Sequence, residues 1–511
     1  MKLMEKRWNS RRQRTNTKRK TTPVAPPLKK RPIELHEQQS LADMQCSAVL
    51  PKYPEGWLKQ IQLINDAGDR RRFLEKRNLL PPDFEHKGPI VRAITRGKID
   101  VFELTDNQLT QFKKIRTNEI NIADPATSAS YSVAPYHAVI SPNLHELDGQ
   151  HTIPIDSYLG NRMSSGVIEI AKHRGCHLFC GGNESKMNSF YKARGFDRAY
   201  RISSNTSTRS FLFTTPDESN LCLVMTSMES LARIEHQLLQ LHFAGVDVVN
   251  KVSIVGTPQQ MKQGTLERLA LALAALPSSA DKKVLFIGSR WKVMEYISRL
   301  LCGIREGTDE EAAYMALDPT EIDIGGLSFT TASKQWMGKR WLFAGLRMPN
   351  GDLAYDATKA FLKAGFDHIV MCGAGGRITG SAKVGDYVSL TTSTLGANLL
   401  RIDEGNQMTP PDRPFVKHDV TSNVTINSPL YGTQRWLDRN REYGIGTVDV
   451  ETHHIFRALL EHDVPVRVLP GIFISDVVGE HPLDEKISGD AAYKNLRQFI
   501  AGALVVLANG K

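Results

Sequence analysis

The chain has few cysteines and no long apolar run. Its 511 residues include only 6 scattered cysteines, which excludes a disulfide-dense scaffold and suits a reducing compartment. The longest uncharged apolar stretch, near 499–509, has about a dozen residues and is too short to span a bilayer. No N-terminal segment joins a basic start to an apolar core, so no secretory signal is expected. The length predicts two or three domains.

The positive charge is concentrated at the N-terminal end. Lys and Arg total 65 and Asp and Glu total 55, a formal net charge of +10. Residues 1–32 hold 12 basic residues and one acidic residue, Glu5, so this segment carries +11 and the rest of the chain −1. A uniformly basic nucleic-acid-binding surface is therefore not indicated.

Residues 1–48 are predicted to form a disordered basic tail, because polar and basic residues dominate it and several prolines oppose a helix. Its basic clusters at 11–14 and 18–20 suit a nuclear import signal, a nucleic-acid or membrane contact, or a delivery signal. A solvated tail without a partner fits equally. We expect a cytoplasmic protein, with nuclear localisation through the tail as the alternative.

The remaining chain divides into three predicted parts. Residues 49–215 are expected to form a mixed α+β domain, and 216–280 a helical connection. The polar, turn-prone segment 277–283 separates a predicted helix from a predicted strand. A second domain is therefore predicted over 281–511.

Apolar strands alternate with helices in this second domain, which predicts an α/β fold with a largely parallel sheet and three α/β/α layers. The expected strands and helices are 284–287, 341–344, 353–363 (a helix closed by Gly365), 368–372, 384–390, 448–460 (strand then helix) and 466–474. Ligands bind beyond the carboxyl ends of strands in such sheets. The turn after Gly288, a glycine turn at 373–376, and Ser475–Asp476 occupy that position.

The predicted glycine turn contains Gly373, Ala374 and Gly375. Glycines allow a backbone to approach a ligand closely and leave N–H groups free to face an anion or a hydroxyl. The turn lacks the spacing of a phosphate-binding Walker loop, and no Lys-Ser/Thr pair follows it. A tight turn without a ligand is the alternative interpretation.

Three segments in order resemble the nucleoside phosphorylase and nucleosidase superfamily, in particular the methylthioadenosine/S-adenosylhomocysteine nucleosidases. Residues 372–376 and 383–388 resemble the family's glycine turn and its "KVGD" strand. Residues 448–452 resemble its "VEMEA" junction, and 474–477 its "ISDV" catalytic segment. The resemblance covers about 283–511, and it implies cleavage of an N-ribosyl bond, which develops positive charge on the sugar and negative charge on the base.

The resemblance assigns two carboxyl groups to that chemistry. Asp476, next to Ser475, would protonate or hydrogen-bond a purine ring nitrogen, and Glu451 would hold the ribose hydroxyls, with Val450 under the sugar. The alternative interpretations are a helix N-cap for Asp476 and a first-turn helix carboxylate for Glu451. Tyr431 is the candidate for stacking on the base, while His453 and His454 are expected to be packing or surface residues.

The sequence departs from the family where the nucleophile binds. The water-activating glutamate of the nucleosidases falls on Val293, and Glu295 comes two residues late. Arg290 and Lys292 can hold an anion such as phosphate, or can belong to a solvated loop. The second arginine and the serine that bind phosphate in phosphorylases fall on Met371 and Ala374. A phosphorylase, a hydrolase with displaced water activation and a catalytically weakened nucleoside-binding domain all remain open.

Residues 131–215 bear a second resemblance, to GNAT-type N-acetyltransferases. Asn183 and the segment 187–196 resemble the family's "N…FYxxxGF" ending, in which Tyr191 would protonate a departing coenzyme A thiolate. Residues 161–164 lack the glycines of the family's pyrophosphate loop. Acetyl-coenzyme A binding is therefore weighed against an inactive scaffold or a chance match.

Metal binding is not expected from the His and Cys residues at 173–180. Cys176 and Cys180 would share one face of a strand while His177 pointed to the other face.

The sequence predicts a nucleosidase or phosphorylase acting on a purine nucleoside or a nucleotide-like substrate, without a required cofactor and with phosphate as an optional co-substrate. A nucleoside-sensing module and a bifunctional protein with an acetyltransferase half are the alternatives. A homo-oligomer is implied by the nucleosidase resemblance.

Overall fold

The computed structural model describes residues 119–120 and 131–509, apart from 141, 143, 148, 164, 183, 203–208, 217–219, 227–229, 306, 325–326 and 481–491. The predicted tail at 1–48 lies outside the described residues, as does most of 49–130. Within the described part, no helix is long and apolar enough to cross a membrane.

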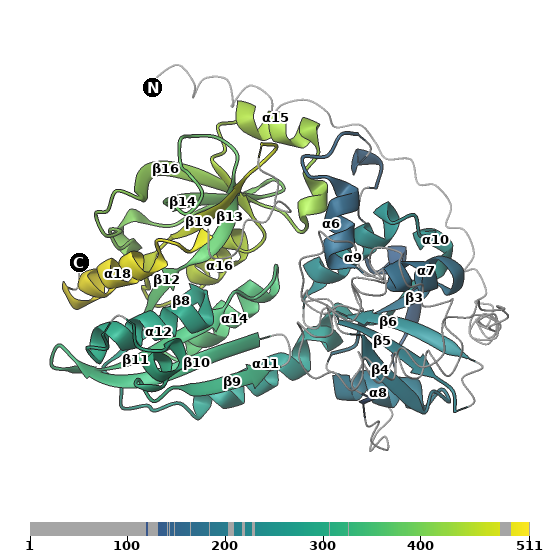
Figure 1. Cartoon of the computed structure of the whole chain (residues 1–511), viewed down its shortest axis with the longest axis horizontal. Coiled ribbons are helices and arrows are strands. Elements are labelled where there is room, and N and C mark those ends of the chain that lie inside the picture. Colours follow the sequence, from purple (N-terminus) through teal and green to yellow (C-terminus); the bar gives the residue numbers. More distant parts are fainter. Residues whose placement is uncertain are drawn as a thin grey trace, which may run out of the picture. The chain divides into compact units, whose positions relative to one another are not determined.

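The first half of the described chain forms a seven-stranded sheet in the order β1-β4-β5-β6-β3-β7-β2 (Figure 1). Strands β4, β5 and β6 pair antiparallel, whereas β6, β3 and β7 pair parallel. Its strands are β1 (Glu119–Ile120), β2 (Val133–Pro135), β3 (Cys176–Cys180), β4 (Arg198–Ile202), β5 (Arg209–Thr214), β6 (Leu221–Thr226) and β7 (Val252–Gly256).

Helices cover this sheet and connect its strands. They are η3 (Tyr136–Ala138), η4 (Leu144–Leu147), α6 (Ile155–Arg162), α7 (Ser165–Arg174), α8 (Glu184–Lys192), α9 (Leu231–Phe243), α10 (Val248–Lys251) and α11 (Pro258–Ala274). Because β6 and β7 belong to the sheet, the predicted helical connection at 216–280 is corrected: sheet strands continue to Gly256. In the sequence, β6 precedes α9 and β7 follows it. The amphipathic pattern of α9 dominates this interval, so the two short strands were not predicted.

The second half contains a six-stranded sheet in the order β18-β12-β8-β11-β10-β9 (Figure 1). Strands β18, β12, β8 and β11 are parallel, and β10 and β9 add antiparallel at one edge. Its strands are β8 (Lys282–Gly288), β9 (Thr320–Ile324), β10 (Leu327–Trp336), β11 (Lys339–Arg347), β12 (His368–Met371) and β18 (Arg467–Leu469).

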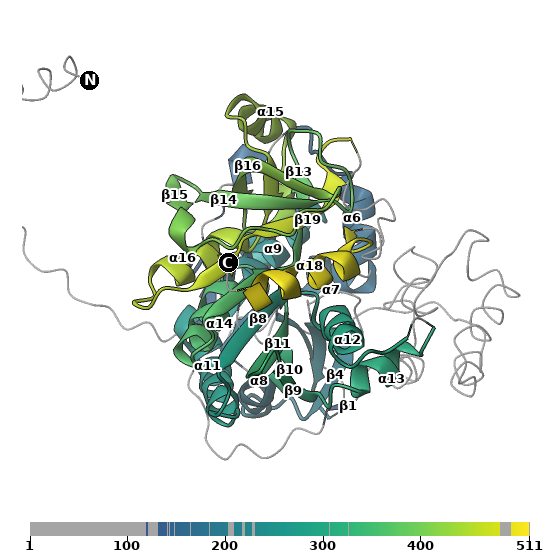
Figure 2. The same ribbon diagram turned by 90° about the vertical axis from the view of Figure 1, so that its left-hand side faces the viewer.

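Helices cover both faces of this sheet. Along β8, Leu285 and Ile287 join one apolar core with α11, α14 and α16, while Val284 and Phe286 join the opposite core with α12 and α18. Helices α12 and α18 pack against each other on their face (Figure 2). All helices of the second half are α12 (Arg290–Leu301), α13 (Glu310–Met315), α14 (Leu353–Lys363), α15 (Gln434–Glu442), α16 (Thr452–Leu460), α18 (Leu496–Asn509) and the short η5 (Glu404–Asn406) and η6 (Pro429–Tyr431), as far as the structure describes it.

A third sheet, which the sequence did not predict, has the order β15-β14-β16-β17-β13-β19. An additional β14–β19 pairing closes five of its strands into a ring. Its strands are β13 (Gly373–Arg377), β14 (Tyr387–Leu395), β15 (Asn398–Arg401), β16 (Val416–Thr425), β17 (Thr447–Asp449) and β19 (Gly471–Val477). The fold is thus mixed α/β with several sheets. The prediction of a single, largely parallel sheet in the second domain was wrong.

The third sheet also corrects three local predictions. The glycine segment is strand β13, not a turn, and the predicted strand over 466–474 is two strands, β18 and β19, that belong to different sheets. The strand predicted at 384–390 begins at Tyr387. By contrast, helix α14 has the predicted bounds, and Gly365 after it has φ +85°, the left-handed conformation expected of a helix-terminating glycine.

Candidate functional site

A cavity of about 170 Å³ lies beside the closed sheet. Its lining comes from β13, β17, β19, the β17–α16 junction, the segment around η6, and two residues of the first half of the chain. The lining residues are Thr152, Ile153, Ala374, Gly375, Gly376, Ile426, Pro429, Gly432, Trp436, Val448, Asp449, Val450, Glu451, Ser475, Asp476, Val478 and Gly479.

Asp476 lies within strand β19, so the predicted position beyond the strand end and the helix N-cap interpretation are both corrected. Gly376 pairs with it in the neighbouring strand, and a Cβ at Gly376 would stand 2.9 Å from the Asp476 Oδ2 atom. The Ser475 hydroxyl donates to Asp476 Oδ1 at 2.5 Å. Burial raises the pKa of Asp476, against the lowering effect of that hydrogen bond. The group is therefore biased toward its protonated, proton-donating form.

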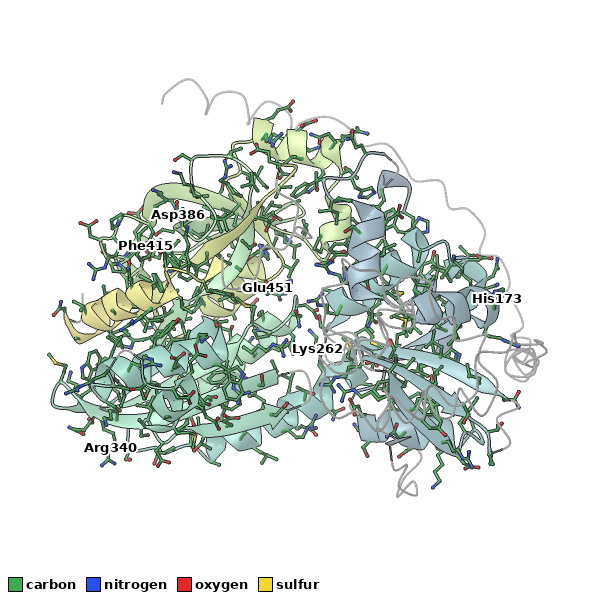
Figure 3. The ribbon with its side chains drawn as sticks, in the orientation of Figure 1. His173, Lys262, Arg340, Asp386, Phe415 and Glu451 are labelled. Atoms are coloured by element: carbon green, nitrogen blue, oxygen red, sulfur yellow. The ribbon has the colours of Figure 1, made fainter. Side chains whose placement is uncertain are left out.

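Glu451 lies at the junction between β17 and α16 (Figure 3). It stands at the N-cap position, but its side chain does not cap the helix. Instead its Oε1 atom faces the backbone N–H of Gly351 at 3.5 Å. Burial and the nearby Asp449 raise the pKa of Glu451 to about 8, whereas the positive charge of Arg233 acts to lower it. The carboxyl group is thus free of the helix and available to a ligand.

Asp449 is a third carboxyl group in the cavity wall, and the sequence analysis missed it. It accepts hydrogen bonds from Asn423 Nδ2 and Thr425 Oγ1, both at 2.9 Å, and from the Thr452 backbone N–H at 3.0 Å. Burial raises its pKa, while these donors lower it. Asp449 caps α16 in place of Glu451, which explains why Glu451 faces the cavity. The sequence signal that could have identified Asp449 was its Asp-x-Glu spacing with Glu451 at the end of a predicted strand.

The first half of the chain forms part of the cavity wall. Thr152 binds the Gly432 carbonyl through its backbone N–H and its hydroxyl, both at 2.8 Å, and the Gln434 N–H donates to the Gln150 carbonyl at 2.7 Å. Thr152 and Ile153 thereby line the site. These two residues had no recognisable signal, because their contacts are about 280 positions away in the sequence.

Helix α9 holds the segment around η6. The His236 ring and the Ser428 hydroxyl are 2.7 Å apart, and Glu235 accepts hydrogen bonds from Asn427 Nδ2 at 2.7 Å and from the Tyr431 hydroxyl. Tyr431 consequently lines a second, adjoining cavity of about 420 Å³ rather than the first. Its predicted place against the base is corrected, and Trp436, which lines both cavities, is the aromatic residue at the site.

Other predicted site residues lie elsewhere. Arg290 donates from Nε to Thr330 at 2.7 Å and pairs with Glu321 at 3.0 Å, while Lys292 pairs with Glu310 at 2.5 Å and Glu295 at 3.4 Å. These partners satisfy both cations outside the cavity, which corrects the predicted anion site. Glu295 also pairs with Arg299 at 2.8 Å and does not line the cavity. Gly373, which was predicted to contact the ligand, does not line the cavity either.

The two histidines after Glu451 are packing residues, as expected. Both are buried, and the His453 Nδ1 atom lies 3.2 Å from the Ser393 carbonyl oxygen.

Tyr191 lies in the core of the first half. It is fully buried, its hydroxyl lies 2.8 Å from His177 Nδ1, and its ring stacks on Phe213. Burial raises its pKa well above the ordinary value. A phenol enclosed in this way has no access to a thiolate, which contradicts the predicted acetyltransferase role. Asn183 lies outside the described residues.

The predicted strand at Cys176–Cys180 is confirmed as β3. Cys176 and Cys180 join the apolar core on one face, and His177 on the other binds Tyr191. The described residues contain no group of three or more His, Cys, Asp or Glu side chains arranged to hold a metal ion.

Comparison with known proteins finds similarity to solved structures over part of the chain. A 5′-methylthioadenosine/S-adenosylhomocysteine nucleosidase from Neisseria meningitidis, in complex with methylthio-immucillin-A, is 16% identical over 44% of this chain and 97% of its own, with a TM-score of 0.28. A futalosine hydrolase mutant of Helicobacter pylori strain 26695 is 13% identical over 45% of this chain and 99% of its own, with a TM-score of 0.31. No family model and no curated protein matches the chain.

Proposed function

We propose that this protein cleaves the N-glycosidic bond of a purine nucleoside or nucleotide-like substrate. The observation that supports this most is the convergence of Glu451 and Asp476, 25 positions apart in the sequence, on one cavity with Val450 and the close-packed β13 backbone. Departure of the base requires an acid at the base and a negative or polar group at the sugar, and the cavity supplies one carboxyl for each task.

The environments of the two carboxyl groups suit different roles. Burial raises the pKa of Asp476 despite the opposing Ser475 hydrogen bond, and this suits the group to deliver a proton to a leaving purine nitrogen. Glu451 lines the cavity from the N-cap position just before α16, where its oxygens can accept hydrogen bonds from ribose hydroxyls. As an anion, it would also stabilise positive charge developing on the sugar.

Direct detection of free base tests this proposal. The full-length protein is incubated with adenosine, inosine, methylthioadenosine and AMP, with and without phosphate, and compared with Asp476→Asn. We expect base release that falls about 10²–10⁴-fold in the variant. Dependence on phosphate would indicate a phosphorylase, and independence a hydrolase.

The exposed residue Asp438 on α15 provides a matched control. It binds Gln434 and does not line the cavity, so Asp438→Asn should keep wild-type activity. No base release from any substrate in either the wild type or Asp476→Asn would contradict the enzymatic proposal.

A second function is favoured by one observation. Glu295, the carboxylate nearest in sequence to the water-activating position of the nucleosidases, is committed to Lys292 and Arg299. A protein without a group that activates the nucleophile would bind nucleosides without turnover. Calorimetric binding that is lost in Glu451→Ala, together with no base release, would identify such a sensor.

A further inference from the structure

The second cavity, of about 420 Å³, has no part in the proposed cleavage. It adjoins the first cavity, and Ile426 and Trp436 belong to both walls. The rest of its wall comes from η4, α9, the ends of β14 and β16, the segment around η6, and α15. Its volume lies in the range of small-molecule sites in proteins. The nature of its lining side chains indicates which ligand it suits.

Two arginines line this cavity from one side of α15. Arg435 and Arg439 are four residues apart, so their side chains lie on the same face of the helix. Both are exposed, and neither forms an ion pair with any residue that the structure describes. Asp438, the acid between them in the sequence, binds Gln434 instead. Both guanidinium groups can therefore bind an anion that enters the cavity.

The one acidic side chain in the described wall already has partners. Glu235 accepts a hydrogen bond from Asn427 Nδ2 at Oε2, at 2.7 Å, and another from the Tyr431 hydroxyl at Oε1. Both carboxylate oxygens thus hold the segment around η6. The lining side chains carry two positive charges, on Arg435 and Arg439, against this single negative charge. The wall therefore favours an anionic ligand over a cationic one.

Apolar side chains make up much of the remaining wall. Leu147 on η4, Leu395 at the end of β14, Ile426 and the Trp436 ring all line the cavity. A small inorganic ion gains nothing from such surfaces, whereas a hydrocarbon chain or an aromatic ring is stabilised by leaving water to contact them. The lining therefore suits a molecule that joins an acid group to an apolar body.

We propose that the second cavity binds a small organic anion, with its acid group on Arg435 and Arg439 and its apolar body against Leu395 and Trp436. Two guanidinium groups offer planar pairs of donors that match the oxygens of an acid group. The anion is either a free organic acid or an acid-bearing substituent of the nucleoside, because the two cavities adjoin at Trp436. The second source rests on the proposed function, and the first does not.

Calorimetric titration of the full-length protein with benzoate, in Tris chloride at low salt, tests this site. Benzamide is the matched ligand, because it has the same ring without the charge. Arg435→Met and Arg439→Met each remove one exposed charge, and Leu395→Glu adds a negative charge to the wall. Arg340→Met is the control variant, because Arg340 is exposed, donates to Ser279 Oγ and lines neither cavity.

We expect benzoate to bind at least about tenfold more tightly than benzamide. Its affinity should fall about tenfold in Arg435→Met, in Arg439→Met and in Leu395→Glu, and should stay unchanged in Arg340→Met. The affinity for benzamide should be the same in the wild type and both α15 arginine variants, since benzamide carries no charge.

Two further ligands distinguish the sources of the anion. They are adenosines that carry a carboxybutyl chain on the 5′ carbon or on N6. If the anion is a substituent of the nucleoside, one of them will bind at least about tenfold more tightly than adenosine, exclude benzoate, and lose this advantage in Arg435→Met. If it is a free acid, neither will have that advantage, and benzoate will bind equally well when adenosine is saturating.

The proposal is contradicted if benzoate and benzamide bind equally well, or if benzoate binds the two α15 arginine variants as tightly as the wild type. It is also contradicted if benzoate does not bind at concentrations up to about 10 mM and neither carboxybutyl adenosine binds more tightly than adenosine. Benzoate titration requires neither a nucleoside nor turnover. Failure of this site is therefore distinguishable from failure of glycosidic cleavage, which the Asp476→Asn comparison reports.

Discussion

Three buried carboxyl groups, Asp449, Glu451 and Asp476, line the cavity at the scale of single residues, and burial raises the pKa of each. The three carboxyl groups differ in their hydrogen-bond partners, which suits them to different roles. Asp449 is held by donors from β16 and α16, Asp476 keeps one hydroxyl donor, and Glu451 has one long contact with a backbone N–H. In the cavity, Asp449 is therefore held in place by several donors, whereas Glu451 and Asp476 have few partners and can form new hydrogen bonds with a ligand.

The raised pKa of Glu451 makes stability depend on pH. The folded carboxyl keeps its proton up to a pH of about 8, whereas the unfolded one releases it near 4.5. Between these values the folded state binds more protons, so the free energy of unfolding falls as the pH rises. Urea unfolding at pH 5 and pH 8 should show a larger loss in the wild type than in Glu451→Gln. Equal losses would contradict the assigned environment.

The neighbouring Asp449 should set the pH dependence of nucleoside binding. If ionised Glu451 holds the ribose, affinity increases as the pH rises toward 8. In Asp449→Asn a negative charge is removed, so the pKa of Glu451 falls and the rise in affinity shifts to lower pH. Calorimetry across pH 5–9 measures the midpoint. A shift to higher pH, or none, would show that Asp449 does not act on Glu451.

At the scale of elements, strand β13 needs glycine because its neighbours approach closely. A Cβ at Gly376 would stand 2.9 Å from both Asp476 Oδ2 and Val478 Cγ2. Gly376→Ala should therefore displace the Asp476 carboxyl and reduce base release by at least about tenfold. Gly405→Ala is the control, since a Cβ there meets only the Asp403 side chain at 3.6 Å. Wild-type turnover in Gly376→Ala would contradict this role for β13.

The sequence motifs predicted which segments meet at the site more reliably than they predicted the secondary structure of each segment. Val448 to Leu460 was identified as strand then helix, and the structure confirms β17 followed by α16. The glycine segment was expected to be a turn, because glycine is depleted in strands. Here it forms a strand because β17 and β19 pack too closely for side chains. Such contacts depend on partners distant in the sequence.

At the scale of the whole molecule, the first half holds the segment around η6, which lines the cavity. Glu235 receives the Asn427 and Tyr431 donors, and the adjacent His236 contacts Ser428. Glu235→Gln replaces a charged acceptor with a neutral amide, which should loosen this segment and raise KM severalfold with little change in kcat. Steady-state kinetics checks this split. A loss confined to kcat would place Glu235 in the chemical step instead.

These contacts explain why the sequence located only part of the site. Glu451 and Asp476 belong to local motifs, so their shared cavity could be anticipated. Thr152 and Arg233 come from the other half, and no local pattern connects them with Gly432 or Asn350. Arg290 had a plausible sequence position for an anion site, but its charge is paired with Glu321. Tertiary contacts decide which charges remain available.

A crystal structure of the protein soaked with a non-hydrolysable purine nucleoside tests the central claim most directly. The account predicts one nucleoside in the cavity, with its ribose hydroxyls within hydrogen-bond distance of Glu451 and a purine nitrogen within hydrogen-bond distance of Asp476. A nucleoside bound elsewhere, or bound in the cavity with either carboxyl group turned away from it, would contradict the account.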